Sequence, residues 1–166
     1  MRSRRVEPAY FRAEKGKIAL SARTLASLAR AVLEKGRPFR FLARGFSMSP
    51  FIRDGDILTV SPVLRNGLTV GDVAAVAHPV TRKLIIHRVT GLAGDSVIVH
   101  GDNAASLDES IPRADILGRV TRIERNGRDV SFGLGPERVL IPRFNRLRRR
   151  AWLRPLLNVL RPVIKP

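Results

Sequence analysis

The chain has 166 residues, enough for one domain with a terminal appendage, and its 44% hydrophobic content suits a modest core. The 31 Lys and Arg residues outnumber the 14 Asp and Glu residues, and the formal net charge of +17 indicates an anionic lipid, nucleic acid or acidic protein partner. The absence of cysteine excludes a disulfide framework and a thiolate metal site.

The N-terminal residues 1–17 are charged and irregular, which predicts a loose arm. The basic start, Met1 to Arg5, is not followed by an apolar segment, so it does not resemble a secretory signal peptide. No apolar run reaches the roughly 18 residues of a transmembrane helix, so we expect no bilayer-spanning segment.

The first regular element is a helix predicted over Ser21–Lys35, with Ser21 as its N-cap and with Gly36 and Pro38 ending it. Its apolar residues recur at helical spacing: Leu25, Leu28, Ala29, Val32 and Leu33. We expect this apolar face to pack on a sheet, the alternative being a helix that binds a partner or a membrane surface.

Short segments rich in β-branched residues follow at even spacing and predict strands at 38–43, 56–63, 73–77, 83–92, 96–100 and 116–123. Residues 101–113 are polar and predict a loop. Asn126-Gly127 predicts a hairpin that pairs residues 120–124 with residues 129–132. One helix followed by many short strands predicts a mainly β fold, a barrel or a folded sheet, in a domain covering 18–136.

The strand predicted at 83–92 has a period-2 alternation that places Ile85, His87 and Val89 on one face and Leu84, Ile86 and Arg88 on the other. Because Arg88 then points away from His87, we expect it to have a structural or surface role and not a catalytic one. The carboxylates expected to pair with Arg88 are Asp72 and Asp95.

A candidate nucleophile lies in the polar segment Gly45–Pro50, just before a Gly55-Asp56 turn and the next strand. Ser47 and Ser49 are the two hydroxyls of this segment. Serine is a poor nucleophile unless a neighbouring base takes its proton. The alternative is a turn serine that hydrogen-bonds its own backbone.

The chain has three histidines from which such a base could come. His87 has apolar neighbours on its strand face, and burial keeps an imidazole neutral, as a general base must be. The alternative for His87 is a core histidine with satisfied hydrogen bonds. His78 precedes a proline and is expected in an exposed loop, and His100 is expected to make a hydrogen bond at a strand end.

A neutral histidine base needs a carboxylate that holds its tautomer and stabilises its charged form. Asp102 and Asp108 both follow the strand predicted at 96–100, and the residues alone leave the choice between them open. Asp102 could instead cap its own loop through backbone amides.

The sequence contains three short motifs, or boxes: Ser47-Met48-x-Pro50, His87-Arg88 and Gly101-Asp102-Asn103. Their order along the chain resembles that in the S24/S26 superfamily of serine peptidases. The similarity extends from about residue 45 to residue 120 and is to the signal peptidase I branch that uses histidine as its base. The lysine-dependent branch has lysine at the position of His87. Ala104 departs from the pattern, which usually has a second asparagine there.

The resemblance implies a serine endopeptidase with a signal-peptidase-like or LexA-like β domain. It implies Ser47 as nucleophile, since the family pattern places the nucleophile before the methionine and so ranks Ser49 second. It further implies His87 as base and Asp108 as the triad carboxylate, with Asp102 as loop organiser or alternate.

The oxyanion hole is expected to use the backbone at Ser47 and Gly45. Some family members have a hydroxyl at the position of Gly45, so a second donor must be a backbone amide or come from elsewhere. No metal or cofactor is expected. The expected substrate is a peptide or precursor protein with small residues beside the cut.

Two other functions are compatible with parts of the sequence. A self-cleaving protein of the LexA type would use lysine as base and have an Ala-Gly or Cys-Gly site before the nucleophile, and no such dipeptide precedes Ser47. A non-catalytic basic module that binds nucleic acid or an acidic protein would explain the charge. One Trp and one Tyr offer few base-stacking surfaces, which makes nucleic acid the weaker partner.

The C-terminal residues 137–166 combine apolar residues with basic charge and predict an amphipathic helical tail, divided at Pro155. Its apolar stripes contain Phe144, Leu147 and Ala151 and then Leu156, Leu157, Leu160 and Ile164. We expect these helices to dock on an anionic membrane surface, or alternatively to cover the edge of the barrel. The expected location is cytoplasmic, and membrane docking of the tail would place the protein at the inner face of the membrane.

Overall fold

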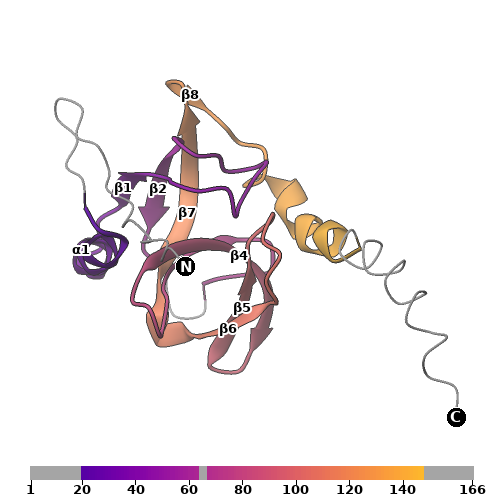
Figure 1. Cartoon of the computed structure of the whole chain (residues 1–166), viewed down its shortest axis with the longest axis horizontal. Helices are drawn as coiled ribbons and strands as arrows, with labels where there is room; N and C mark the ends of the chain where they lie inside the picture. Colours follow the sequence, from indigo (N-terminus) through magenta and orange to yellow (C-terminus); the bar gives the residue numbers. More distant parts are fainter. Residues whose placement is uncertain (1–19, 64–66, 148–166) are drawn as a thin grey trace, which may run out of the picture.

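A computed structural model describes residues 20–63 and 67–147 of the chain (Figure 1). The regular elements are α1 (Ala22–Glu34), β1 (Phe39–Leu42), β2 (Ile57–Ser61), β3 (Val73–Ala77), β4 (Leu84–Ala93), β5 (Ser96–His100), β6 (Glu109–Pro112), η1 (Arg113–Asp115), β7 (Ile116–Arg125), β8 (Arg128–Asp129) and η2 (Pro136–Val139). All strands belong to one antiparallel sheet in the order β1-β2-β7-β3-β4-β5-β6, with β8 paired to β7. The predicted mainly β fold with one leading helix is confirmed.

Helix α1 begins as the sequence indicates, because the Ser21 hydroxyl accepts a 3.1 Å hydrogen bond from the Thr24 amide. The helix packs on the sheet through Ala26, Ala29 and Leu33, which are all buried. The small side chains of the two alanines allow the helix to approach the strands closely. The expectation for Leu28 is wrong: it lies at the flank of this face and is 43% exposed.

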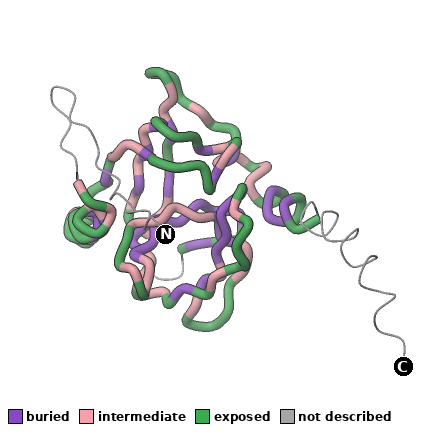
Figure 2. Tube along the Cα trace, in the orientation of Figure 1, coloured by how far each residue is buried: buried purple, intermediate pink, exposed green. Residues whose placement is uncertain are grey.

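The sheet encloses two apolar clusters. Figure 2 shows buried residues along the strands of the sheet. The first lies between α1 and the strands β1, β2, β3 and β7, and the second lies among β3, β4, β5 and β6, so β3 contributes to both. His78 Nε2, just after β3, lies 3.6 Å from Glu109 Oε2 at the start of β6, although β4 and β5 separate these strands in the sheet. The sheet therefore curls so that these four strands surround the second cluster, and β7 runs through both parts (Figure 1).

The two faces predicted for the strand at 83–92 are confirmed. Leu84 and Ile86 pack against the first cluster, and Ile85 and Val89 belong to the second. His87 lies between Ile85 and Val89 on the second face.

The loop predicted at 101–113 is partly wrong, because β6 forms within it and pairs with β5. Ile111 is the only residue of β6 that is buried, so the strand has little hydrophobic signal in the sequence. The Asn126-Gly127 hairpin is confirmed, with φ angles of 52° and 74°, but β8 is shorter than predicted.

After η2, residues 141–147 are helical, and their inward side contains Ile141 and Asn145, both buried. Asn145 Nδ2 donates a 2.9 Å hydrogen bond to Asp102, so this segment packs on the β domain. The predicted arm at 1–17 and the stripes beyond Leu147 lie outside the described residues. Within the ranges that the structure describes, no helix is long and apolar enough to cross a membrane.

Candidate active site

Ser47 lies in the loop that leads from β1 to β2, and backbone hydrogen bonds fix this loop at both ends. The Ala43 amide donates to the Asp56 carbonyl at 2.7 Å, and the Gly55 amide donates to the Ala43 carbonyl at 3.0 Å. Gly45 has φ +98°, which favours glycine, and its amide donates to Asp54 Oδ1 at 2.8 Å. The Gly45 amide is thus already hydrogen-bonded to Asp54.

The segment Gly101-Asp102-Asn103 holds the Ser47 loop from the other side. The Asn103 amide donates a 2.7 Å hydrogen bond to the Ser47 carbonyl, and Asn103 Nδ2 donates to the Phe46 carbonyl at 3.4 Å. The three-residue box therefore positions the candidate nucleophile through the backbone, although the 53 residues 48–100 separate Ser47 from Gly101.

Gly101 shows how closely the two candidate residues approach this box. A Cβ atom at Gly101 would lie 2.8 Å from the Ser47 carbonyl oxygen and 3.1 Å from His87 Nε2. The Nε2 side of the imidazole therefore faces the Ser47 loop, and no side chain larger than hydrogen fits between them without a shift of the loop or the ring.

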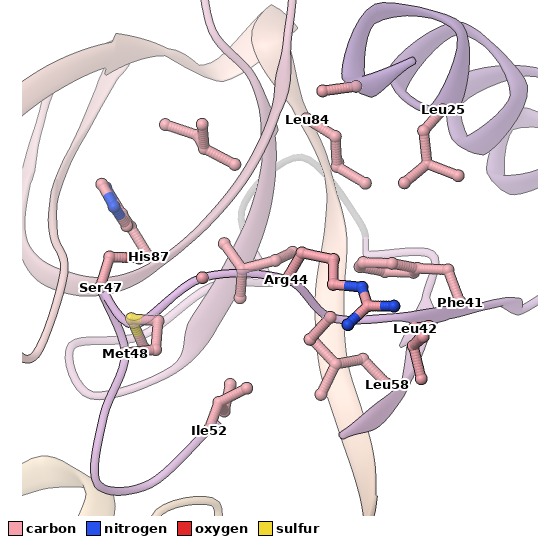
Figure 3. Close-up of a pocket in the computed structure, with 15 residues that line it drawn as sticks. Leu25, Phe41, Leu42, Arg44, Ser47, Met48, Ile52, Leu58, Leu84 and His87 are labelled. Atoms are coloured by element: carbon pink, nitrogen blue, oxygen red, sulfur yellow. The ribbon is translucent and has the colours of Figure 1, made fainter. Parts of the chain in front are cut away.

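Ser47 and His87 line the same pocket, a cavity of about 200 Å³ (Figure 3). Figure 3 shows the two side chains next to each other at one end of this pocket, with Met48 beside them. The remaining wall is mostly apolar and comes from α1, β1, β2 and β4, including Leu25, Phe41 and Leu84. The hydroxyl and the imidazole thus lie at the end of an apolar cavity.

The environment of His87 favours the neutral imidazole. Burial lowers the pKa of His87 below its ordinary value of 6.5, which outweighs the opposing effect of the negative charges of Glu109 and Asp102. The positive forms of His100 and His78 lower the pKa further. Neutral His87 is the protonation state in which an imidazole can accept a proton from serine.

Asp102 is buried and has Arg88 as its main partner. Arg88 Nε lies 2.8 and 3.0 Å from the two carboxylate oxygens, and its terminal NH2 group donates to Oδ2 at 2.7 Å. Arg88 also donates to the carbonyls of Gly71 and Gly133 and lies over the Phe51 ring. Arg88 and Asp102 together thereby link β4, the 101–103 box and the segment that follows β8.

The expectations for Arg88 need a correction. Arg88 is 1% exposed and therefore has no surface role, and its carboxylate partner is Asp102, not the expected Asp72 or Asp95. The reason is that β4 is a central strand, covered on the Arg88 side by the loop that contains Phe51. A guanidinium in that position needs a buried carboxylate and carbonyls to satisfy its five N–H groups.

Asp108 lies just before β6. Its Oδ2 accepts a 3.3 Å hydrogen bond from the Thr90 hydroxyl and lies 4.0 Å from Arg146. His87 Nδ1, in contrast, is buried and has no hydrogen-bond partner among the described residues. The structure thus brings Ser47 and His87 together with the 101–103 box, and His87 Nδ1 donates to neither Asp102 nor Asp108.

The other two histidines have partners of their own. His100 Nε2 lies 2.9 Å from the Ser106 carbonyl, which is the strand-end hydrogen bond expected from the sequence. His78 Nδ1 accepts the amides of Val80 and Thr81, both at 3.2 Å. His87 is therefore the histidine whose ring lies beside Ser47.

Two residues of the site were absent from the sequence expectations. Asn145 donates to Asp102 from the C-terminal helix, and Glu109 at the start of β6 lies beside His78, with a negative charge that acts on the pKa of His87. The position of Glu109 next to Asp108 was a signal that could have indicated it. Among the residues that the structure describes, no group of His, Asp and Glu side chains is arranged to hold a metal ion.

Comparison with known proteins identifies the family. Residues 8–121 match a family model described as Peptidase S24-like, and this match covers more than half of the chain. The chain belongs to the Peptidase S24-like family. The domain is thus of a peptidase type, which supports hydrolase activity. A search of curated proteins finds no match.

Proposed function

We propose that this S24-like domain is a serine endopeptidase of the signal-peptidase type, with Ser47 as nucleophile and His87 as general base. The observation that carries the proposal is the approach of Ser47 and His87 Nε2 around Gly101, at the end of one pocket. The lowered pKa of His87 supports it, because the imidazole is then neutral near pH 7. The resemblance implies Asp108 as the orienting carboxylate, and the proposal made here is for Ser47 and His87 alone.

The proposed reaction is acyl transfer in two steps. Ser47 Oγ attacks the scissile carbonyl while His87 Nε2 takes its proton, and the imidazolium then gives that proton to the leaving amine. Water, activated by the same imidazole, attacks the resulting ester and releases the second peptide with Ser47 restored. The Ser47 amide is the proposed oxyanion donor, together with a further donor that is not the Gly45 amide.

We propose a peptide or precursor protein as substrate, bound in an extended form. The ladder between β4 and β5 begins at Arg88, so residues 84–87 have β3 on one side and the pocket on the other. An extended peptide could pair with that edge of β4 and direct its side chains into the apolar cavity. The modest size of the cavity favours small side chains beside the cut.

Self-cleavage of the LexA type is the alternative within the same superfamily. That reaction would use lysine as base, and His87 occupies the corresponding position in this chain. Among the residues that the structure describes, none of those lining the pocket is a lysine. Incubation of the purified chain alone, followed by intact mass measurement, distinguishes the two: self-cleavage changes the mass without any added peptide.

The test is a comparison of Ser47→Ala with the matched variant Ser49→Ala. Each protein is incubated with a mixture of synthetic peptides, and the cuts are mapped by mass spectrometry. We expect Ser47→Ala to lose cleavage and Ser49→Ala to keep it. Undiminished cleavage by Ser47→Ala would refute the proposed function, and a gel-shift assay at two salt concentrations would then test a basic binding module.

We further propose that the enzyme works at an anionic membrane surface, on the cytoplasmic side. The outward residues Leu140, Phe144 and Leu147 are 61%, 65% and 65% exposed. Arg143 and Arg146 are exposed beside them, so apolar and positively charged side chains share one surface. This combination is typical of helices that lie in a membrane interface.

A further inference from the structure

His87 Nδ1 and Glu109 Oε2 are both buried, and neither has a hydrogen-bond partner among the described residues. Such atoms are rare in folded proteins, because each buried polar atom without a partner costs free energy. If His87 Nε2 accepts the proton of Ser47, then Nδ1 carries a hydrogen and is a donor. A glutamate oxygen is an acceptor, so the two unpartnered atoms are complementary.

The strand register places both side chains on the same face of the sheet. Val89 of β4 is opposite Val99 of β5, and Val99 is opposite Glu109 of β6. Opposed residues of antiparallel strands share a face, as do residues two apart along a strand. His87, two residues before Val89, and Glu109 therefore both face the second apolar cluster.

The contact between His78 and Glu109 shows how the curl of the sheet brings this glutamate inward. Glu109 Oε2 lies 3.6 Å from His78 Nε2, and His78 follows a strand, β3, that is paired directly with β4. Ala74 of β3 is opposite His87, and Val76 is opposite Ile85. The carboxylate of Glu109 is thus held at the side of β4 on which the His87 ring lies.

The other carboxylates near His87 have different surroundings. Asp102 is bound by Arg88 and Asn145, and Asp108 accepts from Thr90 and lies near Arg146. Among the charges that act on His87, that of Glu109 has the largest effect on its pKa, and it favours the protonated ring. A carboxylate with this effect stabilises the imidazolium that forms during acyl transfer.

We propose that Glu109 is the residue that positions His87, in the role that the family resemblance assigns to Asp108. The inference rests on the proposed function, since it presumes that His87 is the base. Glu109 Oε2 accepts the hydrogen of His87 Nδ1, fixes the tautomer with a free Nε2 and stabilises the charged ring. No such bond is made in this structure, and catalytic hydrogen bonds often tighten only in the complex with substrate.

The test compares Glu109→Gln with Asp108→Asn, using the peptide that wild-type protein cuts fastest in a synthetic mixture. Removal of an orienting carboxylate from a catalytic triad typically lowers kcat steeply, so we expect Glu109→Gln to lose at least about 100-fold. Asp108→Asn should change kcat by less than about threefold, and Glu109→Asp should recover part of the activity because it retains the charge. Circular dichroism and thermal melts establish that each variant folds.

A second measurement does not depend on turnover. In a Ser47→Ala background, NMR titration of the His87 ring should show a lower pKa when Glu109 is replaced by Gln, because the negative charge that favours the imidazolium is lost. The groups that face His87 also include His78, His100 and Asp102, and all of them stay in place in this comparison. An unchanged pKa would mean that the Glu109 carboxylate does not act on the His87 ring.

The outcomes separate the two proposals. Full activity of Glu109→Gln with an unchanged His87 pKa, while Ser47→Ala and His87→Ala are inactive, overturns the role of Glu109 and leaves the proposed function intact. A strong loss in Asp108→Asn alone assigns the role to Asp108 and likewise overturns the inference. Full activity of Ser47→Ala overturns both. If Glu109→Gln does not fold, kcat and the His87 pKa are measured for Glu109→Asp instead. Wild-type values of both would overturn the role of Glu109.

Discussion

Arg88 and Asp102 form an ion pair in which each side chain is only 1% exposed, with a closest N–O distance of 2.7 Å. The pair connects β4, where Arg88 follows the candidate base His87, to the 101–103 box that holds the Ser47 loop. Asp102 is the middle residue of this box. The Asn103 amide, next in the chain, donates to the Ser47 carbonyl. The position of His87 on β4 and the position of Ser47 are therefore coupled through one buried contact.

Arg88→Ala should destabilise the protein strongly. Removal of one partner of a buried ion pair leaves the other charge uncompensated and typically costs about 3–5 kcal/mol. Chemical denaturation of wild type and variant measures this difference. Arg122→Ala is the matched control, because its 2.7 Å ion pair with Asp129 is exposed and should add little to the free energy of unfolding. Equal stability of the two variants would contradict the structural role of Arg88.

Gly101→Ala should impair catalysis more than stability. The new methyl group would lie 2.8 Å from the Ser47 carbonyl oxygen and 3.1 Å from His87 Nε2, so the Ser47 loop or the His87 ring must shift. A displacement of about 1 Å in a reactive pair can cost on the order of 100-fold in rate. Peptide cleavage by purified protein measures kcat/KM.

Gly91→Ala is the control for that experiment. Its methyl group would meet only the Ile98 side chain, at 3.3 Å or more, and that side chain can adjust. We expect near wild-type kcat/KM for Gly91→Ala. If Gly101→Ala cleaved the peptide as fast as Gly91→Ala does, the close approach of Ser47 and His87 would not be needed for activity.

Much of the fold could be predicted because its elements carry local signals. Ser21 caps α1, the alternation around His87 matches the two apolar clusters, and Asn126-Gly127 forms its hairpin. β6 was missed because β5 supplies its pairing and only Ile111 is buried. Such a strand is determined by its neighbour in the sheet and not by its own periodicity.

The site was predictable to the extent that it follows the order of motifs along the chain. Ser47 and His87 come together as expected, but the choice of carboxylate depends on which side chains meet across strands. Arg88 takes Asp102, and the curl of the sheet brings Glu109 to face the second cluster beside His78. A one-dimensional pattern does not contain these contacts, because they depend on register and curvature.

The pH dependence of cleavage should follow the neutral form of His87. Burial lowers the pKa of His87, so kcat/KM should fall with a midpoint below about 6.5, as the base becomes protonated. We expect full activity at pH values well above this midpoint. A profile of kcat/KM against pH measures it, and a midpoint clearly above 6.5 would contradict the effect of burial.

The same group should make stability depend on pH. The unfolded chain binds a proton at His87 more readily than the folded chain does, because the folded pKa is the lower of the two. The free energy of unfolding should therefore decrease as the pH falls from about 6.5 through the folded pKa, and its His87 contribution is fully present above 6.5. Urea denaturation of wild type and His87→Gln at a series of pH values isolates this contribution, which the variant should lack.

Binding to anionic membranes should depend on the outward face of the C-terminal helix. Phe144 and Leu147 are each 65% exposed, and exposed Arg143 and Arg146 lie in the same helical segment. Basic side chains near an anionic leaflet contribute about 1 kcal/mol each, and insertion of the two apolar side chains adds to this. We expect the full chain to co-sediment with phosphatidylglycerol vesicles and to dissociate as salt is raised, because screening weakens the electrostatic part.

The variant that tests this surface is Phe144→Ser combined with Leu147→Ser, which leaves the buried Ile141 and Asn145 in place. It should bind the vesicles at least about tenfold more weakly, since both substitutions remove apolar area that would leave water on binding. Val80→Ser is the control, because Val80 is 85% exposed and lies in the turn between β3 and β4. Equal binding by the double variant and the control, or no binding by wild type at low salt, would show that this face does not dock on anionic membranes.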